Sequence, residues 1–301
     1  MTDYVLLSDS TTDLPAGMAA DLDVEIVPLS YIIDHVVYDD VWGGSSADGV
    51  VSPAAHEFYD MMRQGTIVTS SQINAQRFIT VFEPYLKAAQ DIVFLAFSSG
   101  MSGTYEQALH AKAQLLARYP ERRISVIDSL TASMGEGLFL TMAANRRADG
   151  ASFDELVDYM LAIRMQIHGW VTVDDLIYLK RSGRLNAPSA IFGNLLNLKP
   201  IIWGDGLGRL TVYKKVRGHK QALLALVERV AKLAHDPTDN PIFFSHTDCI
   251  AVVDELKAML VERFGTKQFV TSFIGPVIGS HIGPGTVGLY FFGKDRLAAE
   301  V

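Results

Sequence analysis

A short apolar run that passes directly into a hydroxyl-rich stretch is the feature that most limits how this chain can fold. Residues 92–97 are apolar, uncharged and bounded by turn residues, which predicts a buried strand. Residues 98–104, Ser-Ser-Gly-Met-Ser-Gly-Thr, follow at once, and apolar side chains then recur at helical spacing over residues 105–116. The order of strand, polar loop and helix is typical of α/β folds.

This stretch also predicts a place where an anion can bind. The first N–H groups of a helix have no partner inside the helix, and the helix dipole favours negative charge there. Three serines and a threonine add hydroxyl donors. A simpler interpretation is that Ser102 caps the helix and the glycines form the turn. The stretch alone does not decide between the two.

Strands and helices alternate through the first half of the chain. Apolar, β-rich runs occupy residues 4–7, 24–33, 92–97 and 124–127, and helical patterns lie between them. Such alternation predicts a parallel sheet covered by helices.

Hydroxyl-rich stretches follow two of these runs, at residues 8–12 and 98–104, and a third, at residues 69–72, follows the short run 66–68. We expect all three to be loops after strands. Parallel sheets bind ligands at the carboxyl ends of their strands, so the three loops are candidates to meet at one edge.

The second half of the chain has a different pattern. Residues 198–203 and 209–216 predict a β-hairpin, and helices then alternate with strands up to residue 291. We therefore expect an α/β protein with two domains: residues 1–160 with a parallel-sheet α/β/α arrangement, and residues 161–301 with an α+β arrangement and a mixed sheet.

A glycine- and proline-rich segment near the C-terminus surrounds a single histidine. Residues 275–285 contain four glycines, two prolines and His281, which predicts a rigid loop between two strands. Two basic segments, residues 180–184 and 214–220, are either solvated faces or a docking surface for an acidic or phosphorylated partner.

Charge and cysteine content exclude several classes of function. Residues 1–62 hold ten Asp, two Glu and no Lys or Arg, within a net charge of −8 for the chain. An acidic N-terminal face would repel a polyanion, so we expect no nucleic-acid partner. The single cysteine, Cys249, excludes an internal disulfide, and no membrane-span or signal-peptide pattern occurs, which indicates a cytoplasmic protein.

Sequence motifs for nucleotides and metals are absent from the chain. It contains no Walker A loop, no HExxH and no CxxC pair. We therefore expect neither a cofactor nor a metal.

A serine acyl-ester hydrolase is the alternative enzymatic interpretation. Gly100, Met101 and Ser102 resemble the start of a Gly-x-Ser-x-Gly nucleophile elbow, with His281 as the base. Thr104 stands where the second glycine belongs, which argues against this interpretation.

Taken together, the motifs resemble those of the DegV family, whose members bind fatty acids and include the binding subunits of bacterial fatty acid kinases. The resemblance spans nearly the whole chain and rests on the order and spacing of Ser8–Thr11, Asp13–Pro15, Thr69–Gln72, Ser98–Tyr105, Asp128–Ser129, Tyr178–Lys180, Gly183–Arg184, Leu195–Ile201, Arg217–Gly218 and Gly275–Gly285.

The resemblance implies two α/β domains that enclose one long-chain fatty acid. Hydroxyls and helix N-terminal amides would hold the carboxylate, and an apolar channel would hold the tail. The residues implied to bind the carboxylate are Thr69, Ser70, Ser99, Ser102 and His281.

The resemblance also implies a non-catalytic role. In the kinase systems a separate ATP-dependent fatty acid kinase subunit phosphorylates the bound carboxylate, and the binding protein contributes no catalytic residue. Arg184 and Arg217 would dock that partner. The bound fatty acid would be the only ligand, and such a carrier is compatible with transient membrane contact.

Overall fold

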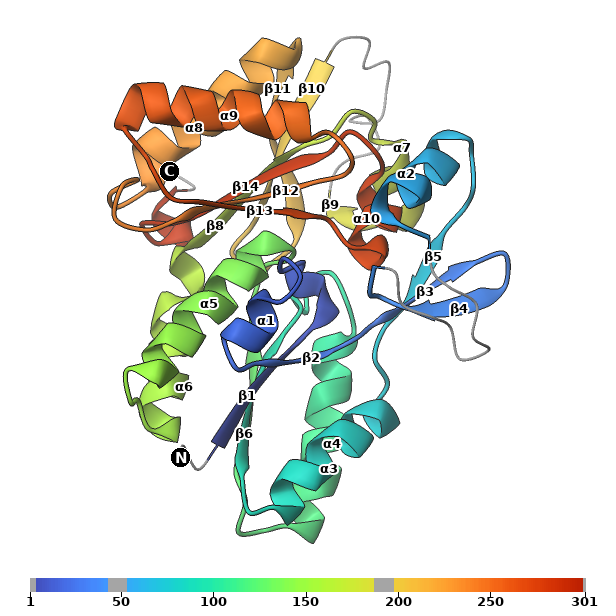
Figure 1. Cartoon of the computed structure of the whole chain (residues 1–301), viewed down its shortest axis with the longest axis vertical. Helices are drawn as coiled ribbons and strands as arrows, with labels where there is room; N and C mark the ends of the chain where they lie inside the picture. Colours follow the sequence, from blue (N-terminus) through green and yellow to red (C-terminus); the bar gives the residue numbers. More distant parts are fainter. Residues whose placement is uncertain (1–3, 43–52, 187–197, 300–301) are drawn as a thin grey trace.

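The computed structural model of the chain describes residues 4–42, 53–186 and 198–299, which form three sheets (Figure 1). The first sheet has four parallel strands in the order β2 (Glu25–Val27), β1 (Tyr4–Asp9), β6 (Asp91–Ala96) and β7 (Ile124–Asp128). The second is mixed and has the order β13 (Phe269–Phe273), β12 (Ile242–His246), β14 (Val287–Phe292), β8 (Ile167–Thr172), β10 (Leu198–Gly204), β11 (Leu210–Arg217) and β9 (Leu185–Asn186). The third contains β4 (Val36–Asp39), β3 (Ser30–Ile33) and β5 (Thr69–Ser71), all antiparallel.

Helices cover these sheets. The α-helices are α1 (Met18–Asp21), α2 (Ala55–Arg63), α3 (Ala75–Lys87), α4 (Thr104–Arg118), α5 (Met134–Ala148), α6 (Phe153–Ile163), α7 (Ile177–Ser182), α8 (His219–Leu233), α9 (Ile250–Phe264) and α10 (Pro276–Ile282). Short 3₁₀ turns occupy Ser10–Thr12, Arg164–Gln166 and Arg296–Ala299.

The predicted parallel sheet with helices on both faces is confirmed. Successive side chains of a strand point to opposite faces, and every residue of β6 is buried. Ile92 and Phe94 belong to the core on the face of α3 and α4, whereas Val93 and Leu95 belong to the core on the face of α5 and α6. Residues 92–97 are therefore all apolar because helices cover both faces of the sheet at this strand.

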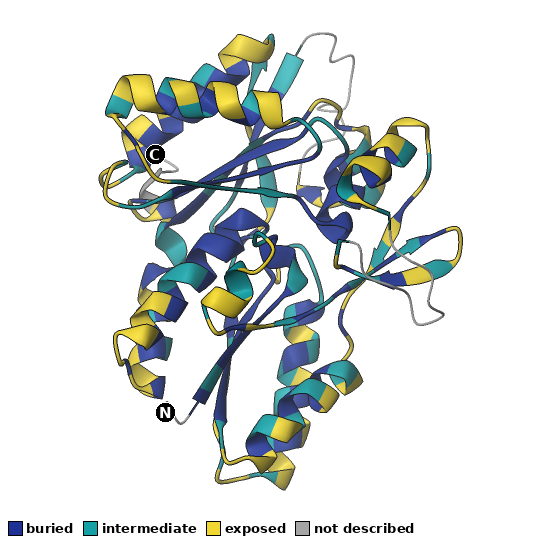
Figure 2. Ribbon diagram, in the orientation of Figure 1, coloured by how far each residue is buried: buried dark blue, intermediate teal, exposed yellow. Residues whose placement is uncertain are grey.

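The mixed sheet is covered by α8 and α9 on one face, and its other face turns toward the carboxyl end of the parallel sheet (Figure 1). The central strands β12 and β14 are buried between these layers (Figure 2). The predicted hairpin is confirmed, because β10 and β11 pair antiparallel. The division at residues 160 and 161 falls inside α6 and stays a prediction.

Three segments expected to be loops contain regular structure. Residues 8–12 supply the end of β1 and the 3₁₀ turn Ser10–Thr12. Residues 69–71 form β5, because their backbone pairs with β3 and places Ser70 opposite Tyr31. The segment 275–285 contains α10, which begins at Pro276 in the first helical position, where a proline is tolerated because its missing N–H has no partner there anyway. The loop predicted around His281 is thus wrong, and His281 lies in the last turn of this helix.

Candidate functional site

A cavity of about 340 Å³ lies between the carboxyl end of the parallel sheet and the mixed sheet. Its wall comes from the loops after β6 and β7, from β5, from α10 and from one face of the mixed sheet. Its size is in the range of pockets that bury most of a small ligand. The two halves of the chain therefore build this cavity together.

Most of the wall is aliphatic or aromatic. The apolar residues that line it are Leu29, Phe97, Met101, Ala132, Val171, Val173, Leu179, Ile202, Leu210, Val277, Ile278 and Ile282. Burial of apolar ligand surface against such a wall is favourable in proportion to the area removed from water. The cavity is therefore suited to a hydrocarbon.

A polar group lies at the rim of the cavity. The Oγ of Ser70 and the Nε2 of His281 are 2.7 Å apart, and both side chains line the cavity. Burial, and then the nearby charge of Arg184, lower the pKa of His281 to about 4. His281 is therefore a neutral imidazole at pH 7, which can donate or accept a hydrogen bond without adding charge.

Arg184 also lies at this rim. Among the described residues that line the cavity, it is the only one with a fixed charge. Its guanidinium donates to the carbonyl of Ser182 at 2.6 Å and remains exposed. A wider polar hollow adjoins the cavity here and shares Met101, Ser102, Gly103 and Arg184 with it. An anionic head group beside Arg184 would therefore contact its guanidinium and also face the adjoining polar hollow.

The predicted site residues separate into two groups. Ser70, Ser102 and His281 line the cavity, but Thr69 and Ser99 do not. Thr69 is exposed because neighbours on a strand point to opposite faces, so only Ser70 of this pair turns inward. The Oγ of Ser99 donates to the carboxylate of Asp128 at 2.5 Å instead.

The serines of residues 98–104 form hydrogen bonds within the protein. Ser98 is buried and donates to the carbonyl of Gly208 at 2.8 Å, which ties the loop to the β10–β11 hairpin. Ser102 Oγ lies 3.0 Å from Thr104 Oγ1 and accepts from the Thr104 N–H. The N-cap of α4 is Gly103, which has no side chain to cap with, so Ser102 bonds to the first N–H of the helix from one position earlier and lines the cavity as well.

The geometry gives the hydrolase interpretation no support. A serine nucleophile needs a base within hydrogen-bond reach, but the described contacts pair His281 with Ser70 and Ser102 with Thr104. The lowered pKa of His281 also makes it a weak base at neutral pH.

The two arginines expected to dock a partner lie in different places. Arg184 is part of the cavity rim, whereas Arg217 is exposed at the end of β11, just before α8. Arg217 does not line the cavity. Their shared role stays a prediction.

The structure contains a cluster of buried carboxyl groups whose burial the sequence pattern did not predict. Asp9, Asp13, Asp40 and Glu136 are all buried, and burial is the largest effect on each. It raises the pKa of Asp9 and of Asp40 to about 6 and the pKa of Asp13 and of Glu136 well above its ordinary value. Asp9 and Asp13 belong to the motifs Ser8–Thr11 and Asp13–Pro15, and Glu136 stands between two glycines, but no local pattern indicated that these carboxyls are buried.

Two of these carboxyls hold the start of α10. Asp13 accepts from the N–H of Gly275 at 2.7 Å, and Asp40 accepts from the N–H of Val277 at 3.1 Å. Asp13 also accepts from the hydroxyl of Ser133, which lines the cavity. The first half of the chain thereby fixes the helix that carries His281.

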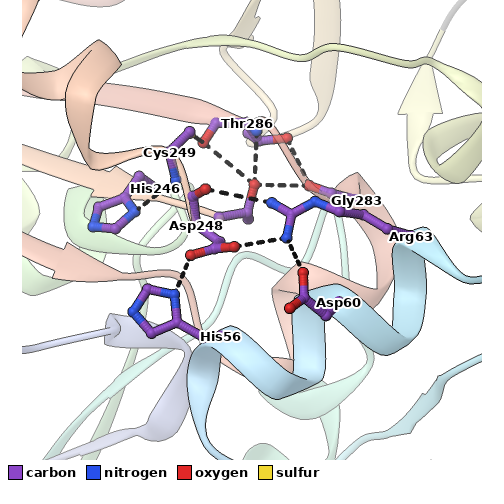
Figure 3. Close-up of polar contacts among 9 residues, drawn as sticks. His56, Asp60, Arg63, His246, Asp248, Cys249, Gly283 and Thr286 are labelled. Atoms are coloured by element: carbon purple, nitrogen blue, oxygen red, sulfur yellow. Dashed lines mark hydrogen bonds and ion pairs between the residues drawn. The ribbon is translucent and has the colours of Figure 1, made fainter.

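A second polar cluster joins α2 to the turn after β12 (Figure 3). Asp248 bonds to His56 and to Arg63, whose guanidinium also reaches Asp60 at 2.7 Å. Figure 3 shows Arg63 between the two carboxylates. These contacts attach α2 to the mixed sheet.

The described ranges 4–42, 53–186 and 198–299 contain neither a cluster of metal-ligating side chains nor a helix suited to cross a membrane. In them, no group of three or more His, Cys, Asp or Glu is arranged to hold a metal ion. Nor does any helix there combine the length and apolar character that a membrane crossing needs.

Known proteins with matching sequences and folds share this architecture. A DegV domain-containing protein of Clostridium perfringens is 36% identical over 296 residues, which cover 98% of this chain and 99% of that relative. The solved structure of a Thermus thermophilus DegV family protein, described as fatty acid binding, superposes with a TM-score of 0.82 at 28% identity and covers 97% of this chain and 99% of that one. A fatty acid binding DegV family protein of Streptococcus agalactiae gives a TM-score of 0.84 at 25% identity, with 98% and 100% covered.

Comparison with sequence models of protein families identifies the same family. The sequence model of a family described as "Uncharacterised protein, DegV family" matches residues 4–294. The resemblance found in the sequence is thus confirmed, and the chain belongs to the DegV family.

Proposed function

We propose that the protein binds one long-chain fatty acid in the cavity, with its carboxylate at the rim and its tail along the apolar wall. The observation that carries this proposal is the composition of the cavity. Its wall is mostly hydrocarbon, and its one fixed charge among the described residues is Arg184, beside the Ser70–His281 pair. The fatty-acid-binding DegV structures of Thermus and Streptococcus support it.

The tail supplies most of the affinity. At about 0.8 kcal/mol for each buried methylene, fifteen methylenes contribute roughly 12 kcal/mol before ordering costs. A hydrogen bond contributes only about 1 kcal/mol net. Ser70, Ser102 and His281 therefore orient the head group, and the apolar wall retains the ligand.

We further propose that the bound carboxylate is presented to an ATP-dependent fatty acid kinase, which converts it to an acyl phosphate. The polar hollow beside the rim, bounded by residues 99–103, 183–186 and Arg209, supports this step because it leaves the head group reachable from outside. In this proposal the chain is not an enzyme, and Arg184 and Arg217 contact the kinase.

Native mass spectrometry of the purified protein, followed by organic extraction, tests the binding function. We expect a complex with one free fatty acid for each chain. A protein that stays without lipid after incubation with fatty acids would contradict the proposal. Covalent labelling of Ser102 by a fluorophosphonate probe would instead support the hydrolase.

A further inference from the structure

One strand of the mixed sheet contributes a row of residues to the cavity wall. Val173, Val171 and Gly169 line the cavity from alternate positions of β8 and the residue after it. The Val173 end of this row lies beside the segment that follows α10, because a Cβ on Gly285 would touch the next residue, Asp174. Gly169 lies four residues away from Val173, or about 13 Å along the strand.

Tyr290 lies beside Gly169, at the other end of this row. It is paired with Gly169 in the sheet register, it lines the cavity, and it is 4% exposed. A Cβ on Gly135, Gly169 or Gly288 would come within 2.9, 3.1 or 2.3 Å of Tyr290 atoms. Its hydroxyl lies 3.0 Å from the Oγ of Ser245. The ring is therefore packed closely against the backbone at these three glycine positions.

The space in front of this ring depends on the missing side chain at position 169. The row along β8 has valine at its first two positions and glycine only at the last. The ideal Cβ at Gly169 would lie 3.1 Å from the Tyr290 ring and 3.8 Å from Thr131 Oγ1, and both of these residues line the cavity. A methyl group there would therefore take up cavity space beside the Tyr290 ring.

We propose that Gly169 and Tyr290 form the end stop that sets the longest acyl chain this protein accepts. The inference rests on the proposed function, since it requires a head group fixed near Ser70 and His281. With that end fixed and the Tyr290 ring packed closely at the other end, each methylene beyond the limit stays outside the apolar wall. The affinity gain of about fourfold per buried methylene then ends at a defined chain length.

The test compares Gly169→Ala with Val171→Ala in the full-length, delipidated protein. Calorimetric titration with saturated fatty acids of increasing length gives the chain length at which affinity stops rising. Gly169→Ala is expected to lower that length by one to two carbons and to weaken binding of the longest accepted acid about fourfold per excluded methylene. Val171→Ala widens the middle of the channel and is expected to leave the limit unchanged. Tyr290→Leu is expected to raise the limit.

The outcomes separate this inference from the proposed function. If wild-type protein binds fatty acids but all three variants stop at the wild-type chain length, the end stop is wrong and the binding function stands. If wild-type protein binds none, both are wrong. Thermal unfolding checks each variant, and if Gly169→Ala does not fold, an unchanged limit in Tyr290→Leu alone overturns the inference.

Discussion

Ser70 and Thr69 are neighbours in sequence, yet only Ser70 faces the cavity. The antiparallel pairing of β5 with β3 turns alternate side chains to opposite sides, and Ser70 Oγ reaches His281 Nε2 at 2.7 Å. A hydroxyl-rich pattern could not show which residue turns inward, because the segment was expected to be a loop. Alanine variants of Ser70 and Thr69 can therefore be compared to test which of the two contacts the ligand.

Ser70→Ala is expected to weaken fatty-acid binding about fivefold, because it removes one head-group hydrogen bond of about 1 kcal/mol. Binding persists because the tail still contacts the apolar wall. Thr69→Ala is expected to have no effect, since Thr69 is exposed and does not line the cavity. Calorimetric titration with one fatty acid measures both. Equal losses in the two variants would contradict the assigned orientation of β5.

At the scale of elements, α10 is held at its start by carboxyl groups from the other half of the chain. Asp13 and Asp40 bond to the first N–H groups of this helix, and the end of the helix carries His281. These contacts join residues more than two hundred positions apart, so no local pattern could have predicted them. The helix itself was missed because four glycines and two prolines favour a loop.

Asp40→Asn is expected to change how stability depends on pH. Burial raises the pKa of Asp40 from 3.8 to about 6, so between these values the folded protein keeps a proton that the unfolded chain releases. The contribution of Asp40 to stability therefore falls as pH rises from 4 to 6, and the variant lacks this loss. Relative to wild type, its free energy of unfolding should rise by up to about 3 kcal/mol across this window.

Chemical denaturation at several pH values measures this difference. Effects of the histidines are common to both proteins and cancel in the comparison. Parallel pH profiles for the variant and wild type would show that Asp40 is not a titrating group of the folded state.

We expect the contacts of Asp248 with His56 and Arg63 to stabilise α2 locally. Asp248→Asn removes the charge that holds Arg63 and His56, and asparagine tolerates the left-handed backbone at this position, where φ is 58°. Amide hydrogen exchange in α2 should become faster. Asp60→Asn is the control, because Asp60 bonds to Arg63 within the same helix and does not reach the mixed sheet. Equal exchange in both variants would contradict the attachment.

At the scale of the whole molecule, the sequence predicted the layers better than the cavity. Buried runs such as residues 92–97 are apolar on both faces, and this local pattern predicts a covered parallel strand. The cavity, in contrast, depends on how the two sheets face each other. Thr131, Gly169 and Tyr290 line it from three distant segments, and none of them carried a signal of its own.

Arg217→Ala tests the proposed encounter with a kinase. Arg217 is exposed and does not line the cavity, so its loss should lower acyl-phosphate formation by the kinase of the same organism and leave bound lipid unchanged. Arg263→Ala, at another exposed arginine on α9, is the control and should retain the wild-type rate. Loss of bound lipid in the Arg217 variant would contradict a docking role.

The most direct test of the account is a crystal structure of the protein with a saturated long-chain fatty acid. We expect the carboxylate within hydrogen-bond distance of Ser70 Oγ or His281 Nε2, beside Arg184. The tail should pass Val171 and end against Tyr290. A carboxylate at the Tyr290 end, or a ligand outside the cavity, would contradict the central claim.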